Sequence, residues 1–148
     1  MVIGNKDRFA IEVFPVDGMS NEFRHIRLWI VGNSLGSMEE SQMIGIFLGE
    51  LERVINSREN NIEISLSEKP ALELLEFFNS DGKYLMSFGE SFDDFHVCSA
   101  QCEGNIIFAW QLHEAPFFEY ENPIYKPLKG IVPIAEVQAA IREVERCR

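Results

Sequence analysis

An alternating apolar pattern that runs from His96 to His113 constrains the fold of this chain more than any other feature. The segments His96–Cys102 and Ile106–His113 flank Glu103-Gly104-Asn105, a short polar stretch with a central glycine. Two alternating runs around such a stretch predict an antiparallel hairpin. The second run then opens into a loop that carries Pro116, Phe117 and Phe118.

The register of this hairpin depends on the length of its turn. A three-residue loop places Trp110 opposite Cys98 and Phe108 opposite Ala100, so that bulky residues on one strand oppose small ones on the other. A two-residue loop instead sets the two aromatic residues against Gln101, Ser99 or Val97. Side-chain packing favours the three-residue loop.

The rest of the chain alternates between strand and helix patterns. Strands are predicted at Phe9–Phe14, Ile26–Ile30, Ser34–Met38, Ile62–Leu66 and Tyr84–Phe88, and period-two alternation supports the first, second and fourth of them. Gly32-Asn33 fits a type II′ hairpin turn between the second and third of these strands. Helical stripes begin at Ser41, Pro70 and Pro133, the first carrying Ile44, Phe47, Leu48, Leu51 and Ile55 and the second Leu72, Leu75 and Phe78. The predicted fold class is α+β, a mainly antiparallel sheet packed by about three helices.

Chain length and composition predict one domain over residues 1–148. The sequence is 46% apolar and 25% charged, which is ordinary for a globular protein. A domain of this size buries roughly 68–70% of its unfolded surface and needs no disulfide or metal to fold. No linker or repeat divides the chain.

The charge balance bears on the kind of partner. With 24 acidic and 13 basic residues the net charge is −11. A field of that sign repels the phosphates of nucleic acids and anionic lipids, and it speeds encounter with basic partners. Binding to nucleic acid is therefore not expected. The alternative is that the acidity serves solubility alone.

Three cysteines bear on the redox environment. Cys98, Cys102 and Cys147 cannot all pair within the chain, and none belongs to a CxxC motif. The polar residues after Met1 do not form the apolar segment of a secretory signal, and no apolar run approaches the roughly 20 residues of a membrane span. We expect reduced cysteines, a cytoplasmic location and no membrane contact.

The same cysteines provide one candidate metal site. His96, Cys98, Cys102 and His113 fall within the predicted hairpin, and imidazole with thiolate can hold zinc. Strand alternation places His113 on the face opposite the other three, so four ligands do not converge. Small cysteines buried beneath aromatic residues are the favoured interpretation, and no metal or cofactor is expected.

Acidic residues before the hairpin provide a second candidate. Glu90, Asp93, Asp94 and His96 could hold a divalent cation or act as an acid and base. A nucleophile at fixed spacing and a phosphate-binding glycine loop are both missing. Solvated loop and partner-binding patch are the two interpretations favoured over catalysis, and no catalytic residue is predicted.

Aromatic residues provide a third candidate. Phe117 is expected to cap the core, whereas Tyr120, between Glu119 and Glu121, suits contact with a basic partner. Trp29 belongs either to a second core layer or to an exposed surface. Since an antiparallel hairpin returns the chain to the end it left, the loops before and after it should emerge at the same edge.

Four segments carry a resemblance to a known family. They are Val2–Ile11, Leu28–Asn33, Phe108–Tyr120 and Val132-Pro133-Ile134. In these segments the chain resembles the bacterial toxin-immunity proteins of immunity protein family 42. The resemblance implies a cytoplasmic antitoxin without catalytic activity, which binds the C-terminal domain of a secreted toxin.

One segment departs from the pattern of that family. An aromatic-glycine-proline linker often precedes the last helix, whereas here Glu121–Ile131 contains Pro123, Pro127 and a later Gly130. The contacts of relatives therefore do not transfer residue by residue. The identity of the toxin and the oligomeric state stay open.

Two classes of function follow. The first is an immunity protein that neutralises a basic toxin domain, expected to be a nuclease, through a surface formed by Glu90, Asp93, Asp94, Glu119, Tyr120 and Glu121. The alternative is a small metal protein or hydrolase that uses the Glu90–His96 acids or the His96, Cys98 and Cys102 hairpin. Metal analysis of the purified protein separates the two.

Overall fold

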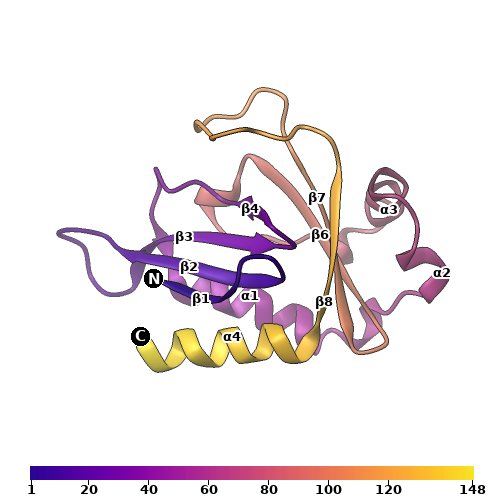
Figure 1. Cartoon of the computed structure of the whole chain (residues 1–148), viewed down its shortest axis with the longest axis horizontal. Helices are drawn as coiled ribbons and strands as arrows, with labels where there is room; N and C mark the ends of the chain where they lie inside the picture. The colour runs from indigo at the N-terminus through magenta and orange to yellow at the C-terminus, as the bar shows by residue number, and fades with distance from the viewer.

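The computed structural model describes all 148 residues and contains two antiparallel sheets with helices packed against them (Figure 1). The strands are β1 (Val2–Asn5), β2 (Phe9–Pro15), β3 (Phe23–Ile30), β4 (Asn33–Leu35), β5 (Gln42–Met43), β6 (Phe95–Cys102), β7 (Asn105–Leu112) and β8 (Leu128–Pro133). The helices are α1 (Ile44–Asn56), α2 (Ile64–Ser67), α3 (Ala71–Phe78) and α4 (Ile134–Cys147), with 3₁₀ turns η1 (Arg58–Asn60), η2 (Gly82–Tyr84) and η3 (Glu90–Phe92). The α+β prediction is confirmed.

The first sheet contains β1 to β5 and has one fully apolar face. Its strand order is β1-β2-β3-β4, and β5 pairs with the far end of β3. Ile11, Ile26 and Leu28 project from that face and are completely buried in the larger of two cores, to which α1 and α4 contribute Phe47 and Val137. Helices α1 and α4 therefore cover this face, as their apolar stripes predicted.

The second sheet, β6-β7-β8, is buried on both faces at its centre. Phe108 and Trp110 project toward the first sheet and complete the larger core. Cys98 and Ala109 project the other way, onto a smaller core that includes Leu74 from α3. Burial on both faces explains why β6 and β7 are apolar along most of their length.

The predicted register of the β6–β7 hairpin is wrong. Cys102 pairs with Asn105 and Trp110 with Val97, so the turn contains two residues rather than three. Both turn residues, Glu103 and Gly104, have positive φ angles of 46° and 80°, which is the geometry of a type I′ turn. The packing argument failed because it assumed one buried face, whereas small and large residues here occupy opposite faces of the sheet.

The β3–β4 hairpin is confirmed, but its turn begins one residue earlier than predicted. Ile30 pairs with Asn33, so Val31 and Gly32 form the turn, with φ angles of 48° and 83°. A positive φ angle is uncommon for a β-branched residue, and the sequence therefore pointed away from Val31.

Two predicted strands are absent. Ile62–Leu66 enters α2, because Ile62 and Leu66 pack together on the smaller core at helical spacing while Ile64 is 45% exposed. Tyr84–Phe88 alternates between buried and exposed residues as a strand does, but its only strand-like pairing is an isolated bridge between Leu85 and Cys98.

Three strands were not predicted: β1, β5 and β8. Strand β5 occupies Gln42–Met43, where the sequence predicted the start of the first helix. Strand β8 lies at the end of a segment that the sequence suggested was a linker, and it pairs with β7 along six residues. A side chain at Gly130 would meet Ile30 at 2.5 Å and Val31 at 2.9 Å. Glycine at this position therefore allows β8 to pass close to the β3–β4 turn. This contact brings the two sheets together.

The helices agree with the predicted stripes apart from one position each in α1 and α3. Val54 is buried in α1 and Ile55 only partly buried, and in α3 Leu74 is buried while Leu72 is 55% exposed. No helix has both the length and the apolar character needed to cross a membrane.

Candidate functional site

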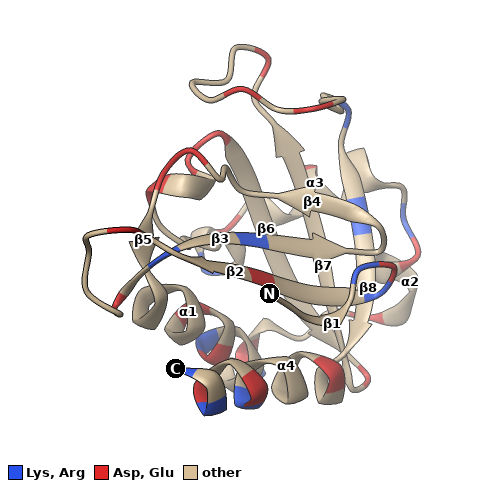
Figure 2. Cartoon of the chain, turned by 60° about the vertical axis from the view of Figure 1, so that its left-hand side comes forward, with Lys and Arg blue, Asp and Glu red and all other residues tan.

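Three loops meet at one edge of the molecule, above β3 and β4 in Figure 2. They comprise residues 36–42, 89–96 and 113–127, including the first residue of β5 and the first two residues of β6. The Ser37 backbone N–H donates to the Ser91 carbonyl at 2.7 Å, and the Glu119 backbone N–H donates to the Glu39 carboxylate at 2.8 Å. We refer to the surface formed by these three loops as the acidic edge.

The acidic edge holds most of the excess negative charge of the protein. Eight of the 24 acidic residues and one of the 13 basic residues, Lys126, lie in these three loops, which leaves 16 acidic against 12 basic residues elsewhere. Figure 2 shows the corresponding red segments along the loops. The negative field is therefore concentrated on one side of the molecule.

Asp94 connects two of the loops. Its carboxylate is 6% exposed and accepts hydrogen bonds from the backbone N–H groups of Phe117 at 2.7 Å and Phe118 at 2.9 Å, and from the Tyr120 hydroxyl at 2.8 Å. Burial alone would raise the Asp94 pKa, but these hydrogen bonds, aided by His113, lower it below its ordinary value. Asp94 is ionised and holds the loop after β7 in place.

Tyr120 lies half-buried over the same carboxylate. Its ring meets Phe95 edge to face, with ring centroids 5.3 Å apart. Burial, with the hydrogen bond to Asp94, raises the Tyr120 pKa far above its ordinary value, so the hydroxyl stays protonated. Two residues that the sequence grouped as partner contacts, Asp94 and Tyr120, thus bind each other.

The structure brings together the two acidic segments that the sequence predicted at one edge. Glu90, Asp93, Glu119 and Glu121 are exposed there, and none forms an ion pair. Sequence reasoning missed the third loop, residues 36–42 with Glu39 and Glu40. Their charge was visible in the sequence, but the contacts between Ser37 and Ser91 and between Glu39 and Glu119 are tertiary.

A cleft of about 520 Å³ lies between the loop after β7 and the outer face of β3 and β4. Its lining includes Trp29, Arg27 and Tyr120, and Glu39, Glu119 and Glu121 belong to both the cleft and the acidic edge. Trp29 is half-buried in the wall of the cleft, between the two locations that the sequence allowed.

Beside the cleft, a buried carboxylate fixes the outer face of the first sheet. Glu12 accepts from Arg27 at 2.7 Å and from the Trp29 indole N–H at 3.0 Å, and the Lys6 ammonium lies 4.5 Å from the Trp29 ring. Burial would raise the Glu12 pKa, but the bonds from Trp29 and Arg27 lower it. The cations of this face are therefore already paired or stacked.

Phe117 contradicts the expectation that it caps the core. Its side chain is 87% exposed, and it meets Phe118 edge to face with centroids 5.1 Å apart. The loop turns this ring outward because Asp94 takes both backbone N–H groups from the inner side.

The histidine and cysteine residues of the hairpin do not converge. His96 Nε2 lies 2.6 Å from Asn79 Oδ1 and 3.5 Å from Cys98 Sγ, whereas Cys102 is at the far end of β6. Cys98 and Cys102 are buried and free, as predicted, and burial raises the Cys98 pKa to about 11. No three His, Cys, Asp or Glu side chains are grouped closely enough to hold a metal ion.

Comparison with known families and structures gives the context of this surface. The family model described as immunity protein 42 matches residues 1–146. The chain belongs to the immunity protein 42 family. Among curated proteins, none matches it. The crystal structure of CdiI from Burkholderia dolosa AUO158 is similar over 100% of both chains, with a TM-score of 0.70 and 17% sequence identity.

Because it belongs to this family, the immunity protein has a role in protection from a toxin. That role implies a cognate toxin as its partner. At 17% identity the likeness to CdiI concerns the fold, and the comparison covers the whole of this immunity protein. The resemblance noted from the four sequence segments is thereby confirmed.

Proposed function

We propose that this immunity protein binds the C-terminal domain of a cognate bacterial toxin and neutralises it without turnover. The proposed toxin is secreted or delivered by cell contact, in keeping with the likeness of fold to CdiI, and the complex forms in the cytoplasm of the protected cell. The observation that carries the proposal is the acidic edge in a member of an immunity family, with eight acidic residues and a single Lys or Arg, Lys126, on three adjoining loops.

The charge distribution supports association with a basic partner. Like charges that have no cationic partner within the protein repel one another and attract an oppositely charged surface. Such a field raises association rates by about 10–10³-fold at low ionic strength. A toxin domain with a basic substrate groove fits this field best.

The proposed activity of the toxin is that of a nuclease. A nuclease presents Lys and Arg to the phosphates of its substrate, and a row of fixed carboxylates resembles those phosphates in charge. The immunity protein would then occlude the groove or the active site. It needs no cofactor and no catalytic residue for this role, and it binds neither nucleic acid nor membrane.

The six residues predicted for the toxin-binding surface take two roles in this proposal. Glu90, Asp93, Glu119 and Glu121 are exposed and contact the toxin directly. Asp94 and Tyr120 hold the loop that presents them, through the hydrogen bond between their side chains.

Coexpression tests the proposed function. The C-terminal domain of the toxin encoded by the gene immediately upstream is expressed with and without the immunity protein, and a tagged copy of the toxin domain is used for copurification. We expect growth to be rescued and a stoichiometric complex to form. Growth arrest despite expression of the folded immunity protein, with no complex recovered, would refute the proposal.

A further inference from the structure

Phe117 has a surface position that folding does not explain. Its side chain is 87% exposed, whereas no other large apolar side chain exceeds the 55% of Leu72. Exposed apolar residues are common singly, but a nearly bare phenyl ring on an ordered loop leaves its hydrophobic surface in water. The ring contributes little to the core.

The loop holds this ring outward rather than letting it move freely. Asp94 Oδ1 accepts from the Phe117 N–H and Asp94 Oδ2 from the Phe118 N–H, and Glu39 accepts from the N–H of Glu119. Backbone groups on both sides of the ring are therefore anchored to other loops. A loop whose backbone is anchored in this way loses little conformational entropy when it binds, which favours its exposed aromatic residue as an interface anchor.

We propose that Phe117 is the anchor of the toxin interface and inserts into an apolar pocket of the toxin domain whose rim is basic. This inference rests on the proposed function and specifies which side chain fills the centre of the contact. The sequence suggested Tyr120 as the residue that contacts the partner. We assign the role of anchor to Phe117 instead, because the Tyr120 hydroxyl donates a hydrogen bond to Asp94.

Charge complementarity decides between a toxin and a second copy of this chain. The ring lies on the loop with Glu114, Glu119 and Glu121, beside the loop of Asp93. Two copies that met through Phe117 would bring two acidic edges together, each with eight acidic residues and only Lys126 to offset them. A basic rim around an apolar pocket satisfies both the ring and the acids.

The variant Phe117→Ala tests this assignment against the isolated toxin C-terminal domain. Since anchors carry most of the binding energy of an interface, we expect affinity to fall on the order of 30-fold or more, mainly through faster dissociation. The matched control is Leu72→Ala, which removes the next most exposed apolar side chain, on α3. We expect the control to bind like the parent and both variants to keep the parental melting temperature.

Three other outcomes would refute the anchor assignment, the proposed function or the toxin pocket. If the parent binds the toxin domain and Phe117→Ala binds equally well, the anchor assignment is wrong while the proposed function stands. If the parent neither binds nor protects, both fail. If sedimentation shows a dimer of the parent that Phe117→Ala abolishes, the ring serves self-association and the toxin pocket is refuted.

Discussion

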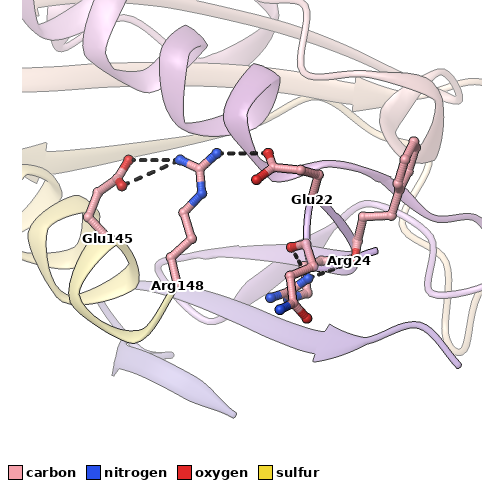
Figure 3. A network of polar contacts seen from close by, with 6 residues as sticks. Glu22, Arg24, Glu145 and Arg148 are labelled. Atoms are coloured by element: carbon pink, nitrogen blue, oxygen red, sulfur yellow. Dashed lines mark hydrogen bonds and ion pairs between the residues drawn. The ribbon is translucent and has the colours of Figure 1, made fainter. Parts of the chain in front are cut away.

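The carboxylates of the acidic edge and those around α4 differ in their partners, since four of the six ion pairs involve α4 or Arg148. All six ion pairs of the protein lie outside the acidic edge: Arg8–Glu136, Arg27–Glu12, Arg53–Glu50, Arg146–Glu143, Arg148–Glu22 and Arg148–Glu145. Figure 3 shows one such group, in which the last residue of the chain joins the end of α4 to the segment before β3. At the acidic edge no carboxylate has a cationic partner of this kind.

Carboxylates in ion pairs contact other parts of the fold, whereas the carboxylates of the acidic edge have no cationic partner within the protein. A paired carboxylate adds little to the external field, because the neighbouring cation cancels it at a distance. Asp94 is the exception that organises the edge, and its donors are two backbone N–H groups and a tyrosine hydroxyl. Donors without net charge fix the loop and leave the negative charge intact.

Removal of Asp94 should produce the largest loss of stability among single changes at the acidic edge. In Asp94→Ala two backbone N–H groups and the Tyr120 hydroxyl lose their acceptor. We expect the free energy of unfolding to fall by about 2 kcal/mol, since unsatisfied buried donors cost about 1–3 kcal/mol each and the loop can partly relax toward water. Urea unfolding measures the change.

The matched control is the neighbouring exposed residue. Asp93→Ala should change the free energy of unfolding by less than about 0.5 kcal/mol. Equal losses for Asp93→Ala and Asp94→Ala would mean that charge density, rather than the three hydrogen bonds, determines the stability of this edge.

The second prediction concerns pH. The folded-state pKa of Asp94 lies below its ordinary value of 3.8, so the unfolded state takes up the proton first as the pH falls. The contribution of Asp94 is therefore complete at neutral pH and is lost as the pH decreases through 3.8 and then through the folded-state value. We expect the stability difference between the parent and Asp94→Asn to shrink over this range.

Urea unfolding at a series of pH values measures this difference, and the use of a difference cancels the titration of the other carboxylates. Glu12, whose pKa is also lowered, contributes equally to both proteins. A stability gap that stays constant from neutral to acidic pH would show that Asp94 has no lowered pKa.

The smallest loss of stability is expected at Arg148, which forms ion pairs with Glu22 and Glu145. Arg148→Ala removes the contacts with Glu22 and Glu145 shown in Figure 3, and it leaves both carboxylates in solvent. Surface ion pairs contribute about 0–1 kcal/mol, so we expect a loss of about 0.5 kcal/mol that disappears at high salt. A loss as large as that of Asp94→Ala would contradict the ranking of the two regions.

Local patterns predicted the parts of the fold in which periodicity and burial agree. The stripes of α1 and α4 and the alternation of β3 were visible because one face of each is buried. Between β6 and β7 both faces are buried, so alternation carried no information about register. Residues 62–66 show the same limit, since Ile62 and Leu66 fit a strand and a helix equally well.

The candidate site was predictable in its charge and not in its contacts. The two acidic segments and their common edge followed from the hairpin. The use of Asp94 as a hydrogen-bond acceptor depends on the path of the loop between β7 and β8, and no local pattern encodes that path. The outward position of Phe117 follows from the same hydrogen bonds. The sequence does not show these bonds, so the apolar ring was expected in the core.

The central claim is that the acidic edge, rather than net charge alone, guides the toxin domain to this protein. Two variants with equal charge change separate these explanations. One converts Glu90, Asp93, Glu119 and Glu121 to their amides. The other converts Glu59, Glu63, Glu68 and Glu73, which are exposed on η1 to α3 and form no ion pairs, to glutamine.

Stopped-flow association with the isolated toxin domain, measured over a range of salt concentrations, compares the two variants with the parent. We predict that the parent associates fast at low salt and slows steeply as salt is added, that the edge variant associates about 10-fold slower at low salt with a flatter salt dependence, and that the η1–α3 variant follows the parent closely. Equal slowing of both variants, or a parental rate that does not change with salt, would contradict the claim.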